Sequence, residues 1–147
     1  MWFLAFAACA GRAPDLAPID GRLPPCPSTP NCVCSEAGAD PDHAIAPLPW
    51  PPGKTPEAVA AALAALVAGE PRAALVRREG GFLHATVRTP LLRFVDDVAF
   101  RLDPEAGVVH VRSASRVGRG DLGVNRSRVE ALRSRWLATV AAPAAAP

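Results

Sequence analysis

The chain has 147 residues, of which 50% are hydrophobic, so it has room for one folded domain with a short leader and tail. Its formal net charge is +2, but residues 1–71 carry three basic and seven acidic side chains, whereas residues 72–147 carry thirteen Arg and seven acids. Tyr is absent and the basic patch is modest, which argues against a nucleic-acid-binding surface of cations and stacking aromatics.

The first nine residues, MWFLAFAAC, are apolar and end in Ala7-Ala8-Cys9, which is similar to a bacterial lipobox. In such a signal, small residues suit the peptidase and the Cys becomes the lipidated N-terminus. A basic segment and a full-length apolar stretch are missing, and a start codon assigned too late would account for both. We therefore interpret residues 1–9 as a lipoprotein-like signal remnant with lipidation at Cys9. We expect an exported, lipid-anchored protein on the periplasmic side of the cell envelope, with membrane contact through the lipid anchor only.

Residues 10–25 are rich in Pro, Gly and Ala and are predicted to form a semi-extended tether. The segment CPSTPNCVC follows, and a Cys26–Cys32 disulfide across its two Pro residues is the favoured pairing, with Cys34 as the alternative partner. A zinc site from these cysteines and His43 fits poorly, because C-x5-C-x-C differs from the usual zinc pairs. We predict no metal and no cofactor.

Thr55-Pro56-Glu57 is typical of a helix start, and apolar residues at helical spacing predict a helix over 56–68. Four strands are predicted next, at 73–79, 82–88, 96–102 and 108–113, because apolar and polar residues alternate and short turns separate the runs. Asn125 is predicted to cap a last helix whose apolar stripe comprises Val129, Leu132, Trp136 and Val140.

These elements predict an α+β fold of two layers, in which a four-stranded antiparallel sheet is packed by two helices in the order α-β-β-β-β-α. The single domain is expected to span residues 26–140, and residues 141–147 form a disordered tail. The strongest test of this architecture is the burial of Val98, Phe100, Val109 and Val111 beneath the helices.

The predicted polar face of the sheet and the loop after its last strand concentrate groups that suit a small anion. The candidate ligand-binding residues are Arg88, Arg93, Asp96, Asp97, Arg112, Ser113, Ser115, Arg116, Asp121 and Asn125. The competing interpretation is an internal network of ion pairs and hydrogen bonds that only holds the loop in place.

Five segments of the chain resemble a known family. They are CPSTPNCVCS, HAIAPL at 43–48, LHATVRT at 83–89, RFVDDVAF at 93–100 and HVRSASRVGRGDLGVNRSRVEALR at 110–133. In this order they resemble the domain-of-unknown-function family DUF1499 over about residues 25–137. The resemblance implies no activity, and it implies that bacterial members are often exported proteins or lipoproteins. The family commonly has Ser where this chain has Cys34.

We expect a non-enzymatic, envelope-associated accessory or binding domain whose Arg-rich loop contacts an anionic small molecule or a protein partner. One alternative is a peripheral subunit of a membrane protein complex. Another is a small hydrolase or isomerase that uses His84, Asp97 and His110, which requires these three side chains to converge in one cleft. The nucleophile elbow, the zinc-protease helix motif and the P-loop are absent from the sequence.

Overall fold

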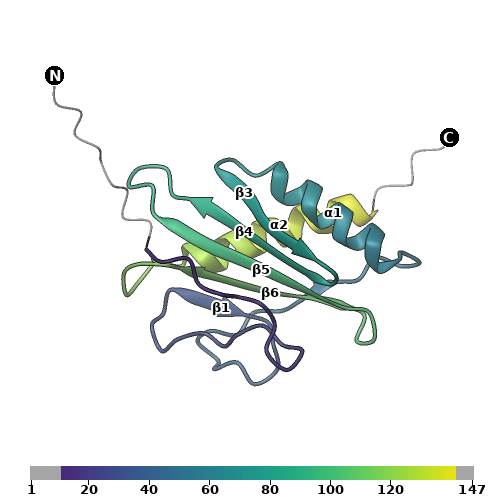
Figure 1. Ribbon diagram of the computed structural model, residues 1–147, viewed down its shortest axis with the longest axis horizontal. Helices are drawn as coiled ribbons and strands as arrows, with labels where there is room; N and C mark the ends of the chain where they lie inside the picture. The colour runs from purple at the N-terminus through teal and green to yellow at the C-terminus, as the bar shows by residue number, and fades with distance from the viewer. Residues whose placement is uncertain (1–10, 142–147) are drawn as a thin grey trace.

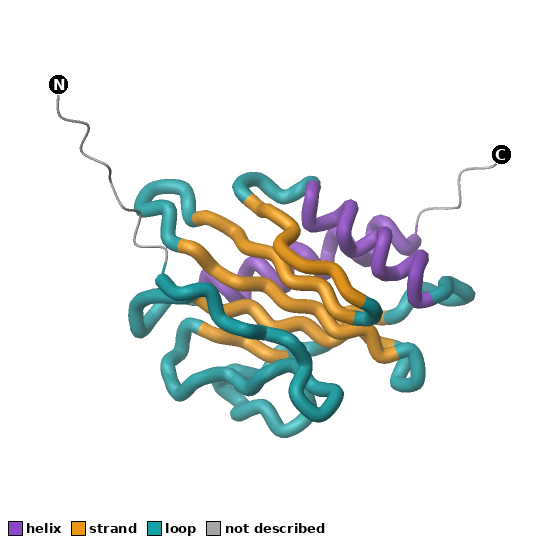
Figure 2. The backbone as a smooth tube through the Cα atoms, in the orientation of Figure 1, coloured by secondary structure: helices purple, strands orange, loops and turns teal. Residues whose placement is uncertain are grey.

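The computed structural model describes residues 11–141; Cys9, the rest of the expected signal remnant, and residues 142–147 lie outside this range. A six-stranded sheet carries two helices on one face (Figures 1 and 2). The elements in chain order are β1 (Cys32–Cys34), β2 (Leu48–Pro49), α1 (Pro56–Ala68), β3 (Ala73–Glu79), β4 (Phe82–Arg88), β5 (Val95–Asp103), β6 (Val108–Ser115) and α2 (Val124–Ala141).

Helix α1 begins and ends where the sequence predicts. The Thr55 hydroxyl accepts a hydrogen bond from the Ala58 amide at 3.2 Å, and Pro56 occupies the first turn, where no intrahelical donor is needed. Strands β3 to β6 also match the prediction and form an antiparallel meander through short connections. The α+β class and its order of main elements are therefore confirmed.

The predicted number of four strands is wrong. The sheet order is β1-β6-β5-β4-β3, and β2 also pairs with β6, so the Pro-rich segment before α1 supplies two more strands. In β1, Val33 lies opposite Ser113 of β6. Strands of three and two residues are too short to show an alternating pattern, which is why the sequence does not reveal them.

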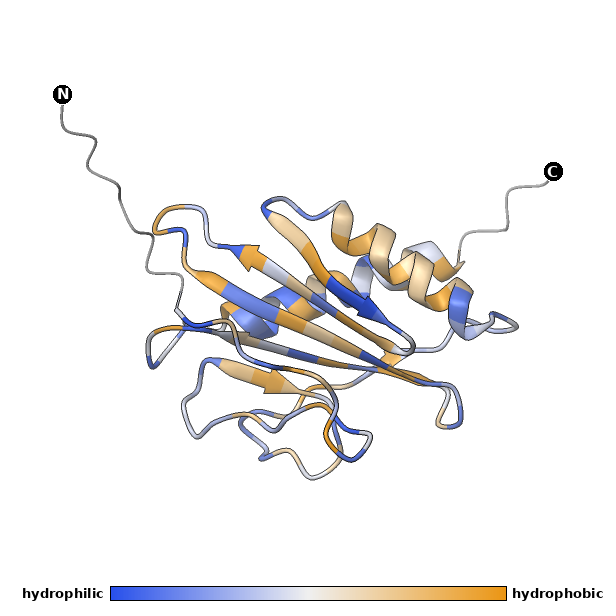
Figure 3. Ribbon diagram, in the orientation of Figure 1, coloured by the Kyte–Doolittle hydropathy of each residue, from blue (hydrophilic) through white to orange (hydrophobic). Residues whose placement is uncertain are grey.

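The core lies between the helices and one face of the sheet. Val98, Phe100, Val109 and Val111 are all buried there, as predicted. Coloured by hydropathy, the strands of the meander carry hydrophobic residues interspersed with polar ones (Figure 3). Trp136 of α2 is also fully buried and donates from its indole nitrogen to the Pro49 carbonyl at 2.8 Å. Burial of these side chains stabilises the two-layer arrangement.

The other face of the sheet was expected to be exposed to solvent, and this expectation is wrong. The N-terminal segment passes in front of the sheet while α2 passes behind it (Figure 1). Leu16 and Leu23, each 3% exposed, pack with Phe82 and Ala99 in a second, smaller cluster. The segment 11–25 is thus attached to the sheet at Leu16 and Leu23, which are its two buried residues, while most of its other residues are exposed. No helix among residues 11–141 has the length and apolar character needed to traverse a bilayer.

Candidate functional site

Asp97 lies on the covered face of the sheet and accepts three hydrogen bonds. Arg116 donates to it from Nε at 2.7 Å and from Nη2 at 2.9 Å, and His84 Nε2 donates at 2.7 Å. Burial would raise the pKa of Asp97, but the hydrogen bonds from Arg116 and His84 outweigh it and hold the pKa below its usual range. The carboxylate is 1% exposed, so it fastens the loop after β6 to the sheet and is closed to a ligand.

The helix-facing side holds a second internal network, centred on Asn125. Its Oδ1 accepts from Ser113 at 2.6 Å and from Arg128 at 2.8 Å, and its Nδ2 lies 2.9 Å from Ser115 Oγ. Arg128 also forms an ion pair with Asp96. Each of these polar groups therefore has a partner within the domain, which supports the competing interpretation for this part of the predicted site.

The prediction that Asn125 caps the last helix is wrong. Asn125 lies inside α2 and is fully buried, whereas Asp121 accepts from the amides of Gly123 and Asn125, both at 2.9 Å. Burial would raise the pKa of Asp121, but the hydrogen bonds from Asn125 and Gly123 lower it overall. Asp121 thus bonds the free amides at the start of α2, which begins at Val124, two residues earlier than a cap at Asn125 predicts.

Arg112 is also unavailable to a ligand in solution. Its side chain lies under the N-terminal segment, is 7% exposed, and reaches the Pro25 carbonyl at 3.5 Å, while its Nε has no hydrogen-bond partner in the described chain. Burial lowers the pKa of this guanidinium. Arg112 was predicted to face a ligand because the sequence does not show that this face is covered.

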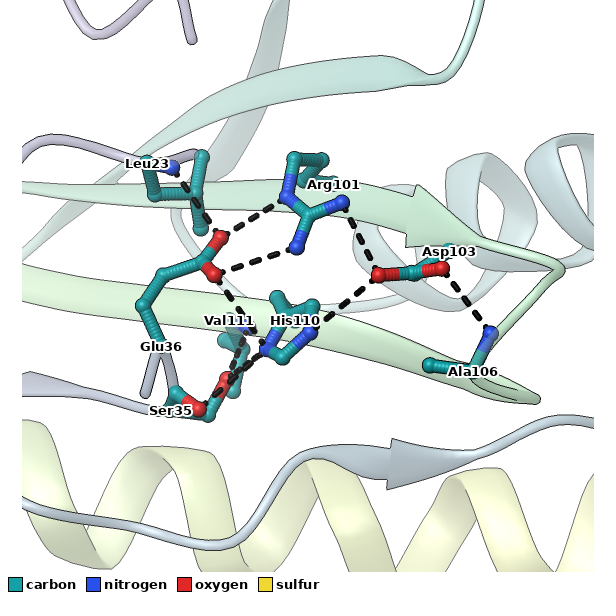
Figure 4. Close-up of polar contacts among 8 residues, drawn as sticks. All are labelled: Leu23, Ser35, Glu36, Arg101, Asp103, Ala106, His110 and Val111. Carbon is teal, nitrogen blue, oxygen red and sulfur yellow. Dashed lines mark hydrogen bonds and ion pairs between the residues drawn. The ribbon is translucent and has the colours of Figure 1, made fainter. Parts of the chain in front are cut away.

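His110 belongs to a different group from His84 and Asp97. Glu36 receives two hydrogen bonds from Arg101, at 2.8 and 3.0 Å, and His110 lies between Ser35 and the acids of this network (Figure 4). Glu36 also accepts from the amide of Leu23 at 3.0 Å, which holds the N-terminal segment on the sheet. His84 and Asp97 therefore belong to one network and His110 to another, so the convergence in one cleft that the hydrolase or isomerase alternative requires is not met.

The predicted disulfide is present between Cys26 and Cys32, and Cys34 is a buried free thiol. Burial raises the pKa of Cys34. Cys26 and Cys34 line a cavity of about 530 Å³ beneath the N-terminal segment. The imidazole Nδ1 of His43 lies 2.9 Å from the Cys32 carbonyl, so it is held by the backbone, and residues 11–141 contain no cluster of three or more potential metal ligands.

An apolar groove of about 800 Å³ lies between the loop that joins β4 to β5 and the loop that joins β6 to α2. Leu91 is 92% exposed, Leu92 70% and Leu122 104%, although they line a concave surface with Phe94 and Val117. Exposed apolar side chains gathered at a concave surface are a common feature of binding sites in proteins. Sequence reasoning missed this groove, although the Leu-Leu pair in a connection between two strands was a visible signal.

Of the predicted ligand-binding residues, Asp96, Ser115 and Asp121 line this groove, whereas neither Arg88, at the end of β4, nor Arg93, in the following loop, is part of its lining. Both arginines are exposed, as is Arg119 on the opposite loop, and none of the three forms an ion pair with any residue from 11 to 141. Arg93 follows Leu92 directly, and Arg119 lies between two glycines that line the groove. The groove therefore has a mainly apolar lining that includes two internally bonded acids, Asp96 and Asp121, and exposed arginines lie in the loops that form it.

The backbone of both groove loops is strained. Arg93 has φ +55° and Leu122 has φ +53°, a conformation that costs a non-glycine residue about 1–2 kcal/mol. Such conformations persist where the surrounding structure holds them, and they are concentrated at binding and active sites. Two of the four non-glycine residues with positive φ in the described chain thus lie in the groove loops, and the other two are Asp20 and Arg72.

Comparison with known proteins places the chain in a family without assigning it an activity. Neither a curated protein nor a solved structure gives a significant match. A family model described as a protein of unknown function, DUF1499, matches residues 22–136. This match spans most of the chain, from the covering segment at Arg22 to the core residue Trp136, and the protein belongs to the DUF1499 family.

Proposed function

We propose that this protein is a non-enzymatic binding domain of the cell envelope that captures an anionic amphiphile in the groove between its two loops. The observation that carries the proposal is the exposure of Leu91, Leu92 and Leu122 around one concave surface. Exposed leucines are ordinary when they are scattered, but three around one groove form an apolar patch of the kind that binds a ligand or partner.

The lining of the groove defines the apolar part of the ligand. Phe94, Val117 and Val124 continue the surface that the leucines begin, so an alkyl chain can make contact along the groove. The acids that reach this surface do not repel an anion strongly, because Asp96 is paired with Arg128 and Asp121 is bonded to the start of α2.

The charged part of the ligand follows from the free arginines. Arg93 and Arg119 are exposed and are next in sequence to groove residues, although neither lines the groove itself, and a guanidinium binds carboxylate and phosphate through two parallel hydrogen bonds. An alkyl chain with a phosphate or carboxylate head satisfies both parts of the surface.

The state of the polar groups in the groove supports binding over catalysis. The hydroxyl of Thr89 accepts from the Phe94 amide at 2.9 Å, and Ser115 is bonded to Asn125 at 2.9 Å. Asp96 and Asp121 are engaged as described above. A nucleophile activated by a neighbouring base is the usual requirement for hydrolysis, and these groups are committed to holding the loops.

The envelope location is supported by two independent features. The leader carries the lipobox-like Ala7-Ala8-Cys9, and the Cys26–Cys32 disulfide is of a kind that forms and persists in an oxidising compartment. An exported domain with an apolar groove and exposed arginines in the loops around it suits an environment rich in acidic lipids and their breakdown products.

Calorimetry with dodecyl phosphate, below its micelle concentration, tests the proposal. We expect saturable binding that weakens by at least about tenfold in a Leu91→Asp/Leu122→Asp double variant, because alkyl contact is lost. The Arg93→Ala/Arg119→Ala variant should lose the preference for dodecyl phosphate over neutral dodecyl maltoside. Leu137→Asp, on α2, is the matched control, because Leu137 is 44% exposed and does not line the groove. Equal binding by the groove variants and this control would refute the proposed site.

A further inference from the structure

We infer that the groove end of the domain docks onto an anionic lipid bilayer, with Leu91, Leu92 and Leu122 entering the interface. This inference rests on the proposed function and names the bilayer as the source of the amphiphile. It also goes beyond a lipid anchor, because the folded domain itself would contact the membrane.

The two ends of the sheet differ in their exposed apolar residues and in their charge. The loops after β4 and β6 lie at one end and carry the exposed leucines, whereas the turns after β3 and β5 lie at the other (Figure 1). The turn after β5, Asp103-Pro104-Glu105-Ala106-Gly107, is acidic and has no large apolar residue. Only the groove end therefore combines apolar loop tips with free cations among the sheet ends of the described chain.

The charge at the groove end complements an anionic surface. Arg12, Arg88, Arg93 and Arg119 are exposed there or next to it, and none has an ion-pair partner within residues 11–141. The three acids nearest the loops are Asp96, Asp97 and Asp121, and each is bonded internally. Arginines flanking apolar loop tips can bind acidic headgroups while the leucines reach the acyl boundary.

The path of the chain gives an independent argument for this orientation. A Cβ atom added to Gly11 would lie 3.0 Å from Arg116 Cβ and 3.3 Å from Val117 Cγ1, so Gly11 packs against the loop that forms one wall of the groove. The described chain therefore begins beside the loop after β6, at the end of the domain that carries the exposed leucines. Cys9 precedes Gly11 by two residues, which span at most about 7 Å.

Vesicle flotation tests the inference on the full chain carrying Cys9→Ser, which removes acylation. We expect binding to phosphatidylglycerol vesicles, weaker binding to phosphatidylcholine vesicles, and a loss of the difference as salt is raised. Because residues 1–10 are themselves apolar, the informative quantity is the difference between chains that are identical in this segment. Leu91→Asp/Leu122→Asp should reduce the bound fraction at least about fivefold, and Arg93→Ala/Arg119→Ala should reduce binding to the phosphatidylcholine level.

Leu137→Asp and Arg78→Ala are the matched controls, because both residues are exposed and lie outside the groove. A nitroxide attached at Leu91→Cys should be shielded from a water-soluble relaxation agent by vesicles, and one attached at Glu105→Cys should not. Flotation equal to that of the controls, or equal accessibility of the two labels, overturns the inference. Dimerisation abolished by Leu91→Asp/Leu122→Asp, without flotation, would also overturn it and assign the leucines to a second copy.

The vesicle and calorimetric experiments can fail separately. If the protein binds dodecyl phosphate but not vesicles, the groove is a site for soluble amphiphiles and the inference of bilayer docking is refuted. If the wild type binds vesicles, the groove variants do not, and dodecyl phosphate does not bind, bilayer docking is supported and capture of a single amphiphile in the groove is refuted. The absence of both removes both proposals.

Discussion

Arg116, at the start of the loop after β6, forms two hydrogen bonds to Asp97 in β5, at 2.7 and 2.9 Å. This pair connects one wall of the groove to the interior of the sheet. The groove loops are therefore held by buried charge, while the arginines next to the groove are free.

Loss of this pair should destabilise the fold. Arg116→Ala leaves the buried Asp97 carboxylate with His84 alone, and breaking a buried ion pair costs about 3 kcal/mol or more. Urea denaturation of the variant and wild type measures the difference in free energy of unfolding. Arg119→Ala, an exposed arginine of the same loop, should change it by less than about 0.5 kcal/mol. A loss below about 1 kcal/mol for Arg116→Ala would contradict the structural role.

Stability should fall in acid because of Asp97. Its pKa in the fold is lowered, so the stabilisation is fully present above the unfolded pKa of about 3.9 and is lost as pH falls through the lower folded pKa. The urea midpoint measured from pH 6 downward should therefore drop steeply below about pH 4 in the wild type. Glu36 and Asp121 have lowered pKa values too, so the contribution of Asp97 is the part of the slope that Asp97→Asn removes. An unchanged slope in that variant would show that Asp97 does not contribute.

Release of the N-terminal segment should follow from Glu36→Ala. Glu36 joins the Leu23 amide to Arg101, and hydrogen bonds to charged groups contribute about 1.5–3 kcal/mol. We expect trypsin to cleave after Arg22 about tenfold faster in this variant, as measured by mass spectrometry. Glu79→Ala removes an exposed acid that pairs with Arg77, and it serves as the control. Similar cleavage rates in the two variants would mean that Glu36 does not hold the segment.

Cys34 should be unreactive while the domain is folded. Its side chain is buried and its thiol pKa is raised by burial, so little thiolate is exposed to a reagent. In a Cys9→Ser chain, Ellman's reagent should react at least about a hundredfold more slowly than in guanidinium, where one thiol should appear without reductant. Fast reaction of the native chain, or a Cys26–Cys34 peptide after digestion, would contradict the assignment.

The sequence predicts the meander and α1 well, because their signals are local. Alternation over several residues marks β3 to β6, and it correctly buries Phe100 and Val111. Thr55 and Pro56 mark the start of α1 within the same short stretch. The two extra strands are too short to alternate, and the Pro-rich composition before α1 gives no indication that Leu16 and Leu23 lie on the sheet.

The candidate site was predictable only in part. The sequence identifies an Arg-rich loop, and it includes Asp96, Ser115 and Asp121, which line the groove, among the candidate residues. It cannot tell which arginine an acid will use: Asp96 pairs with Arg128 in the next helix, and this contact depends on how the helix packs. Leu91 and Leu92 were overlooked because apolar residues in a turn have no periodicity, and their exposure depends on tertiary structure.

Strand β1, the first of the described chain, forms its backbone ladder with β6, the last strand, so that Cys32 lies opposite Ala114. During synthesis the early segment remains without its partner strand until nearly all of the rest of the chain has emerged. Contacts between distant parts of a chain slow folding and leave intermediates open to aggregation. A chaperone that shields the early segment from non-native contacts, or rapid formation of the nearby Cys26–Cys32 disulfide, would reduce the risk of aggregation before β1 pairs with β6.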